Sequence, residues 1–120
     1  MRRGRTLLAS ALLAAAAACA PSISGINARP DKYYQHRVKL TGRIARMQAL
    51  SGTMLFELQD ARGARILVHT ATPVEVETGD WVRVEGILVP ETRVDDSVLY
   101  DVVQAEHVSR ARAPRLRDLM

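Results

Sequence analysis

Apolar residues recur at every second position over much of the sequence between Val38 and Val108. Such alternation is typical of β-strands that have one face buried and the other in solvent. It predicts five strands, over residues 38–45, 54–59, 65–69, 81–89 and 98–108, the last of them broken near its middle. Gly42 stands inside the first strand, where we expect a bulge or a tight bend.

Turn-forming residues separate these strands. Ser51-Gly52 marks a turn, and residues 60–63 form a hairpin connection in which Gly63 supplies a positive φ. Residues 70–78 are expected to connect two strands without a long helix. Pro90 is expected to end the fourth strand, and residues 91–97 to form a polar loop.

The residues before the first strand are expected to lead into the domain. Residues 23–28 are predicted to make one helical turn, and Pro30 to break any helix. We expect Tyr33 and Tyr34 to pack against the end of the domain.

Five short strands with glycine-containing turns predict an all-β fold, a small barrel or sandwich. The order of the elements resembles the oligonucleotide/oligosaccharide-binding (OB) fold, a five-stranded Greek-key barrel. The resemblance lies in three segments, VKLTGRI at 38–44, FELQDARG at 56–63 and GDWVRVEG at 79–86. It covers roughly residues 36–109 and implies a binding domain, without specifying the ligand.

The amino-terminal residues predict export. Three arginines precede an apolar run from Leu7 to Ala18, which is shorter than the roughly 20 apolar residues that span a bilayer. A basic segment, a short apolar run and small residues before a cleavage site describe a signal peptide, here residues 1–18.

Cys19 is the only cysteine in the chain and directly follows Ala16-Ala17-Ala18. This run of small residues ending in cysteine resembles the bacterial lipoprotein signal, although the family often has leucine where Ala16 stands. The resemblance implies that Cys19 carries a diacylglycerol, that the chain is cut before it, and that its new amine is acylated, with palmitate among the fatty acids. Two or three acyl chains anchor a protein firmly, whereas one does not.

The basic net charge of the sequence is not evidence for a nucleic-acid-binding domain. The net charge of +4 includes Arg2, Arg3 and Arg5, so the 102 residues after the predicted cleavage carry +1. The tail, residues 110–120, accounts for +3, which leaves −2 for residues 19–109. The tail is expected to be flexible, and its arginines could touch anionic lipid headgroups.

The sequence offers no catalytic constellation. His36, His69 and His107 are far apart and lack the spacing of a zinc site, and Asp95-Asp96 is typical of a solvated turn. We therefore predict no enzyme activity, no cofactor and no metal site.

The predicted ligand face is the outer side of the early strands, which OB barrels use for binding. Its candidate residues are Lys39, Thr41, Arg43, Gln59, Arg65 and His69, with Glu57 and Leu67 among them. The cations are compatible with a phosphate backbone, but they also fit an ordinary charged strand face with cross-strand pairs. Phe56 is expected in the core, and Trp81 and Tyr100 are expected to lie away from this face.

The segment QAEHVSRA at 104–111 resembles the end of a periplasmic haem chaperone, a membrane-tethered OB barrel that binds haem through a histidine. His107 is near the expected position, whereas Ala111 stands where that family has tyrosine.

The sequence thus predicts a signal peptide (1–18), a lipidated tether (19–35), an OB-like barrel (36–109) and a basic tail (110–120). We predict a non-catalytic binding or adaptor lipoprotein of the cell envelope, anchored through Cys19 and facing the periplasm. Ala20 favours the outer membrane, because it is not the aspartate of the enteric inner-membrane retention signal. Its partner is expected to be an envelope protein, and the alternatives are single-stranded nucleic acid and haem.

Overall fold

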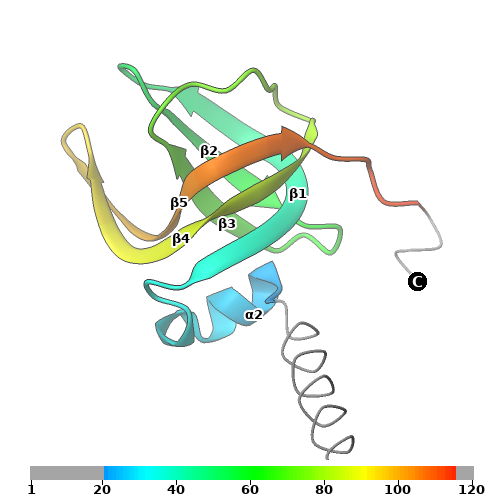
Figure 1. The fold of residues 1–120 in the computed structure, drawn as a ribbon, viewed down its shortest axis with the longest axis horizontal. Helices are drawn as coiled ribbons and strands as arrows, with labels where there is room; N and C mark the ends of the chain where they lie inside the picture. The colour runs from blue at the N-terminus through cyan, green and yellow to red at the C-terminus, as the bar shows by residue number, and fades with distance from the viewer. Residues whose placement is uncertain (1–20, 116–120) are drawn as a thin grey trace, which may run out of the picture.

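The computed structural model describes residues 21–115, which form a short helical segment followed by five strands. The strands are β1 (Arg37–Ala49), β2 (Met54–Gln59), β3 (Arg65–Thr70), β4 (Trp81–Val94) and β5 (Ser97–Arg110). They close into a barrel in the order β1-β2-β3-β5-β4, in which only β3 and β5 are parallel (Figure 1). The all-β Greek-key prediction is confirmed.

The helix α2 (Ile23–Ala28) lies below the barrel in Figure 1. Ser22 caps it by accepting a hydrogen bond from the Gly25 N–H, and Ile23 and Ile26 are buried in the barrel core. The 3-10 helix η1 (Pro30–Lys32) follows, and Tyr33 and Tyr34 pack against the core. The predicted helical turn and the packing of both tyrosines are confirmed.

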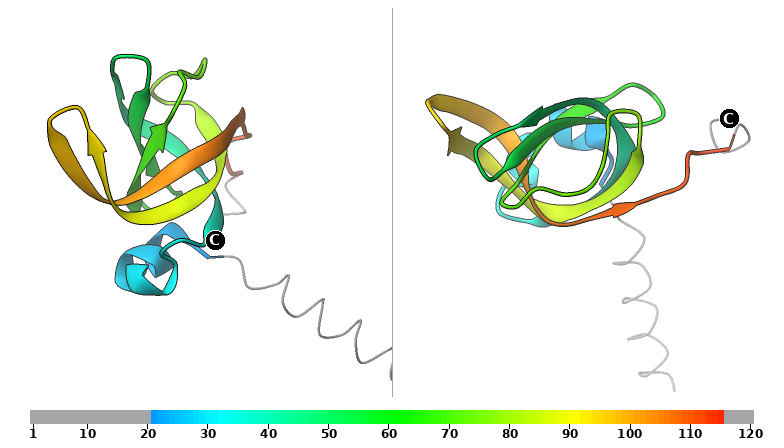
Figure 2. Two further views of the ribbon diagram at one scale, coloured as in Figure 1. Left: turned by 60° about the vertical axis from the view of Figure 1, so that its left-hand side comes forward. Right: turned by 90° about the horizontal axis from the view of Figure 1, so that it is seen from above.

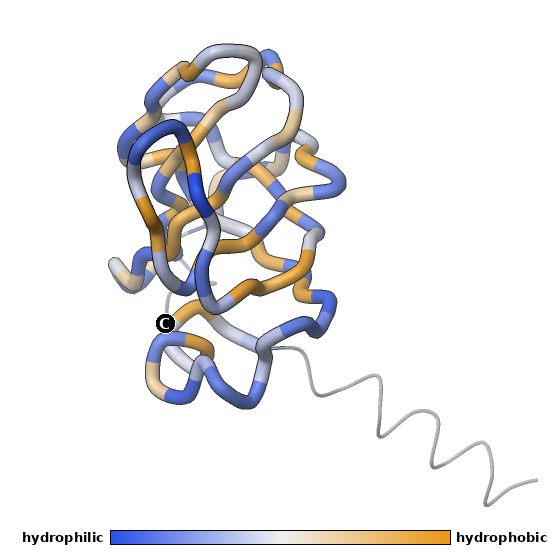
Figure 3. Tube along the Cα trace, turned by 90° about the vertical axis from the view of Figure 1, so that its left-hand side faces the viewer, coloured by the Kyte–Doolittle hydropathy of each residue, from blue (hydrophilic) through white to orange (hydrophobic). Residues whose placement is uncertain are grey.

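Alternation along the strands builds the core, as the hydropathy colouring in Figure 3 shows. Inward-facing positions of β1–β4 are almost fully buried, among them Leu40, Ile44, Phe56, Leu58 and Val84. The predicted hairpin of β2 with β3 is antiparallel, and β1 pairs antiparallel with β2 across the predicted turn at Ser51-Gly52.

β1 pairs with two neighbouring strands. Its residues Arg37–Arg43 pair with β4, and Arg43–Ala49 pair with β2. The bulge lies at Ala45, between the paired residues Ile44 and Arg46, and not at Gly42. Gly42 is needed for a different reason: a Cβ there would stand 2.7 Å from the carbonyl oxygen of Gln59. It allows β1 to cross close to β2 where the strand changes partner.

β4 and β5 continue beyond the barrel as a two-stranded ribbon, which we call the arm (residues 89–101). The arm projects away from the barrel in Figures 1 and 2. The expectations that Pro90 ends β4 and that residues 91–97 form a loop are wrong, because only Asp95-Asp96 form the turn. β1 stops pairing with β4 at Ile87, so Pro90 lies in a strand that is paired on one side only, where a missing N–H is tolerated.

β5 is a single strand with two irregularities, rather than a strand broken in its middle. Asp101 has a positive φ of 55°, and the extra residue Glu106 shifts the register opposite Glu85 and Gly86. These features let the outer half of β5 run in the arm while its inner half closes the barrel against β3.

Residues 111–115 form no helix or strand, and the predicted signal peptide, Cys19 and the last five residues lie outside the described residues. Within residues 21–115, no helix has the length and apolar character needed to cross a bilayer.

Candidate ligand-binding face

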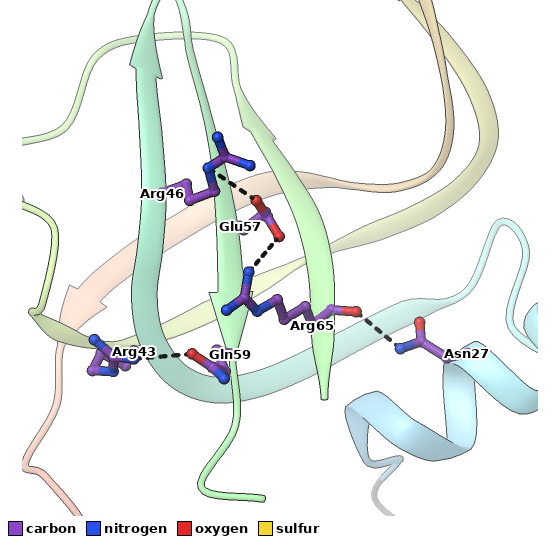
Figure 4. Close-up of polar contacts among 6 residues, drawn as sticks. All are labelled: Asn27, Arg43, Arg46, Glu57, Gln59 and Arg65. Atoms are coloured by element: carbon purple, nitrogen blue, oxygen red, sulfur yellow. Dashed lines mark hydrogen bonds and ion pairs between the residues drawn. The ribbon is translucent and has the colours of Figure 1, made fainter. Parts of the chain in front are cut away.

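A row of polar side chains crosses the outer surface of β1, β2 and β3. Arg43 is in register with Gln59, and Gln59 with Arg65, so the three side chains point to the same side. Arg43 Nη2 donates to Gln59 Oε1 at 3.0 Å (Figure 4). At the end of the row, Asn27 of α2 donates to the Arg65 carbonyl oxygen at 2.9 Å, which ties the helix to β3.

Glu57 lies at the centre of the next row and neutralises part of the basic charge. Its carboxylate is 3.8 Å from Arg46 Nε and 3.4 Å from Arg65 Nη1 (Figure 4). The arginine side chains are well exposed, so each pair contributes less than about 1 kcal/mol to stability. The ion pairs matter more for ligand binding than for stability. The carboxylate of Glu57 makes this face less cationic than its arginines alone would make it.

An open groove of about 440 Å³ lies beside Glu57, and we call it the Leu67 groove. Half-buried Leu55 and Leu67 and the more exposed Met47 contribute its apolar surface. Arg46, Gln48 and Glu57 contribute its polar surface. The groove therefore combines apolar surface with the ion-paired side chains of Arg46 and Glu57.

His69 connects the β3 side of this face to the arm. Its Nδ1 is 2.8 Å from Gln104 Oε1, and Gln104 Nε2 donates to Thr92 Oγ1 at 3.0 Å. The imidazole therefore takes part in a structural contact between β3 and the arm.

A second contact fixes the base of the arm. The Tyr34 hydroxyl donates to Asp101 Oδ1, at the residue with the positive φ. This hydrogen bond and the negative charge of Asp101 raise the pKa of Tyr34 above its usual value of 10.0.

Lys39 and Thr41 do not belong to the same cluster as Arg43, Gln59 and Arg65. Lys39 Nζ pairs with Glu85 of β4 at 3.2 Å, whereas His69 is at the opposite side of the face. Thr41 lines a separate pocket of about 390 Å³, which we call the Trp81 pocket. The six predicted residues therefore divide among four places.

The expectation that Trp81 lies away from the face is wrong. Trp81 is in register with Arg43 across the β1–β4 pair and is half-buried, so its indole lies on the outer side beside that arginine. Because Val82 is buried, the alternation along β4 already predicts that Trp81 points to the outer face. Only the register of β4 against β1 shows that Trp81 is the neighbour of Arg43. Tyr100 is in the arm and is 65% exposed.

The remaining polar candidates stand apart from the groove. His107 is exposed on β5 opposite Glu85, and Asp95 and Asp96 form the tip of the arm. Residues 21–115 contain no group of three or more histidine, cysteine or acidic side chains able to hold a metal ion.

No protein-family model and no curated protein match the sequence. Solved structures are similar in fold. The asparaginyl-tRNA synthetase from Pyrococcus horikoshii aligns with 79% of this chain and 23% of its own, at 16% identity and a TM-score of 0.58. The telomere capping protein Ten1 from Saccharomyces pombe aligns over 81% and 84% of the two chains, at 17% identity and a TM-score of 0.52.

The barrel has an OB fold. A third similar structure, the OBody AM1L10 bound to hen egg-white lysozyme, covers 68% of this chain and 85% of its own, with 14% identity and a TM-score of 0.51. This chain spans about a quarter of the length of the synthetase. At these identities the likeness concerns the OB fold alone.

Proposed function

We propose that this protein is a non-catalytic envelope lipoprotein, anchored through Cys19, whose OB barrel binds a protein partner in the periplasm. The basic amino-terminal segment, the apolar run and Ala16-Ala17-Ala18-Cys19 support the anchor. Ala20 favours the outer membrane. The barrel supplies the binding surface, and its role is that of an adaptor.

The Leu67 groove carries the proposal of a protein partner. Protein interfaces combine apolar and polar surface, and the groove does so too, because Leu55, Leu67 and Met47 line it together with the ion-paired Arg46 and Glu57. The OBody AM1L10 binds lysozyme, so a barrel of this fold accepts a protein.

Single-stranded nucleic acid is the alternative ligand, and it fits the groove less well. Glu57 pairs with two of the arginines, and the groove contains no exposed aromatic platform on which bases could stack. Trp81 beside Arg43 is the feature that favours it.

The anchor is tested first by the mass of the mature protein purified from bacterial membranes. We expect a chain that begins at Cys19 and carries two or three acyl groups, and a Cys19→Ser variant that carries no acyl group and keeps its signal peptide. An unmodified Cys19 would show that the anchor is wrong.

The groove is tested by placing a photoreactive phenylalanine at Leu67 and, as a control, at exposed His107 on β5. We expect one partner protein to crosslink in cells from position 67 and not from position 107. A Leu67→Asp variant should lose the partner while the barrel stays folded. Equal crosslinking from both positions would contradict binding in the groove.

The nucleic-acid alternative predicts a different response. Anisotropy of a fluorescent oligonucleotide would show binding that weakens steeply between about 50 and 200 mM salt and is lost in Arg43→Glu. Tight, salt-sensitive binding of this kind would replace the protein partner in our proposal.

A further inference from the structure

The Trp81 pocket lies where the described chain begins. Ser22 and Ser24 at the start of α2, Thr41 of β1 and Arg62 of the β2–β3 turn line it together with Trp81. Pro114, from the carboxy-terminal segment, also borders it. The pocket is therefore next to the residues that join the barrel to the predicted anchor.

The reach of the tether limits how far this end can be from a membrane. Ser22 follows Cys19 by three residues, and three residues span at most about 11 Å when fully extended. α2 cannot swing freely on the barrel, because Ile23 and Ile26 are buried in its core and Asn27 is hydrogen-bonded to β3. If Cys19 is lipidated, the Trp81 pocket is held within this distance of the lipid surface.

The side chains around the pocket suit phospholipid headgroups. Tryptophan is enriched at membrane interfaces, because its ring is apolar and its N–H is polar. Trp81 is the only tryptophan of the chain, and it is half-buried on the outer side of β4. Its indole thus combines partial exposure with a position close to the tether.

Basic charge surrounds the indole. Arg43 is in register with Trp81, Arg83 with Thr41, and Arg62 lines the pocket. Among residues 21–115, no carboxylate lies within ion-pair distance of Arg62 or Arg83. These two guanidinium groups are available to lipid phosphates.

The neighbouring acids are already engaged within the protein. Asp60 Oδ1 accepts hydrogen bonds from the backbone N–H groups of Arg62 and Ala64, each at 2.9 Å. Asp80 accepts from the Glu77 N–H at 2.9 Å and is 3.9 Å from Arg110. Asp60 also lines the pocket and keeps its negative charge, but Arg43, Arg62 and Arg83 outnumber it, so the net charge at this end is positive.

We propose that the Trp81 pocket is a membrane-contacting surface, in which the Trp81 indole and the guanidinium groups of Arg62 and Arg83 enter the headgroup layer of an anionic phospholipid membrane. The inference rests on the proposed anchor at Cys19. It fixes the orientation of the barrel, because the Leu67 groove lies past the β1 bulge, at the end of β2 away from the β2–β3 turn. The groove then faces away from the membrane, toward partners.

Because Trp81 is the single tryptophan, its fluorescence tests the membrane contact in the unsubstituted protein. The full chain is purified from bacterial membranes and reconstituted into vesicles of phosphatidylethanolamine and phosphatidylglycerol, with and without brominated acyl chains. Upon selective tryptophan excitation, we expect emission at shorter wavelength than in detergent and at least about twofold quenching by the brominated lipid, because Trp81 contacts the membrane interface.

A matched control moves the fluorophore to the arm. In the double variant Trp81→Phe, Tyr100→Trp, the single tryptophan occupies a position that is 65% exposed in the native protein. Its emission should remain that of a hydrated indole and should be quenched by aqueous acrylamide and not by brominated lipid. Equal brominated-lipid quenching at both positions would overturn a fixed orientation.

The basic side chains have their own control pair. Arg62→Glu should reduce the quenching of Trp81 in vesicles that contain phosphatidylglycerol, whereas Arg93→Glu in the arm should leave it unchanged. Equal quenching in the two variants would overturn the role of Arg62 at the membrane.

The anchor and the membrane contact can fail separately. A chain that carries lipid on Cys19 by mass, but whose Trp81 is fully open to acrylamide, overturns the membrane contact and leaves the anchor standing. A chain without lipid on Cys19 overturns the anchor and the membrane contact with it.

Discussion

Gly86 stands where β4 passes closest to β5, and no side chain fits there. A Cβ on Gly86 would be 2.2 Å from the Gln104 carbonyl oxygen and 2.8 Å from the Ala105 Cα. Both are backbone atoms, so no rotamer change can relieve the overlap. Because ordinary contacts begin at 3.4 Å, Gly86→Ala requires the strands to separate by about 1.2 Å at the oxygen.

The cost follows from what this separation disrupts. Overpacking a tight site costs about 1–3 kcal/mol, and each weakened backbone hydrogen bond between β4 and β5 adds about 1 kcal/mol. We expect Gly86→Ala to lower the free energy of unfolding by about 3 kcal/mol or more. With a urea m-value of about 1–1.5 kcal/mol/M for a domain of this size, the midpoint falls by about 2 M or more.

Urea unfolding of a soluble form that begins after Cys19, followed by circular dichroism, measures this change. Gly52→Ala is the matched control, because Gly52 has a φ of 77° but no atom within 4 Å of the place that a Cβ would occupy. It should lose only about 1–2 kcal/mol, the cost of the left-handed backbone. A Gly86→Ala midpoint within about 0.3 M of the unsubstituted protein would refute the steric argument.

Three further outcomes are expected from other parts of the barrel. Leu58→Ala, at a fully buried position, should lower the free energy of unfolding by about 2–5 kcal/mol in the same urea assay, and a smaller loss would mean that the core closes over the cavity. Glu57→Gln should cost less than about 1 kcal/mol, because Arg46 and Arg65 are exposed; a larger loss would show a stronger ion-pair network than the distances suggest. The raised pKa of Tyr34 means that its contact with Asp101 stabilises the fold below pH 10 and is lost as the pH rises through the folded-state pKa. An ultraviolet titration of tyrosinate should show one late-ionising tyrosine that disappears in Tyr34→Phe, and a late step that persists in Asp101→Asn would contradict Asp101 as its cause.

Alternation along the chain predicted most of the barrel, because burial of one strand face is a local property of the sequence. The core positions of β1–β3 follow from it. The alternation did not predict the arm. Proline usually ends a strand, and the sequence does not show that β4 is paired on one side only beyond Ile87.

The candidate face was less accessible to sequence reasoning, since it depends on register between distant strands. Cross-strand pairing of Glu57 with Arg65 was one of two interpretations of the charged face, and the structure contains this pair. The neighbourhood of Trp81 and Arg43 was missed, because they are 38 residues apart and meet only through the β1–β4 pairing. Likewise, the alternation of Lys39 with Thr41 and Arg43 could not show that Glu85 engages Lys39.

The parallel pairing of β3 with β5 has a consequence for the order of folding. β5 contacts both β3 and β4, and it occupies Ser97–Arg110, near the end of the chain. A chain emerging from a ribosome or a translocation channel can form the β1–β2–β3 meander early, but β3 keeps an unpaired edge until β5 arrives. Such edges recruit other strands, and pairings distant in sequence form slowly. Completion of the last strand therefore closes this edge, and until then the unfinished barrel is open to pairing with strands of other chains.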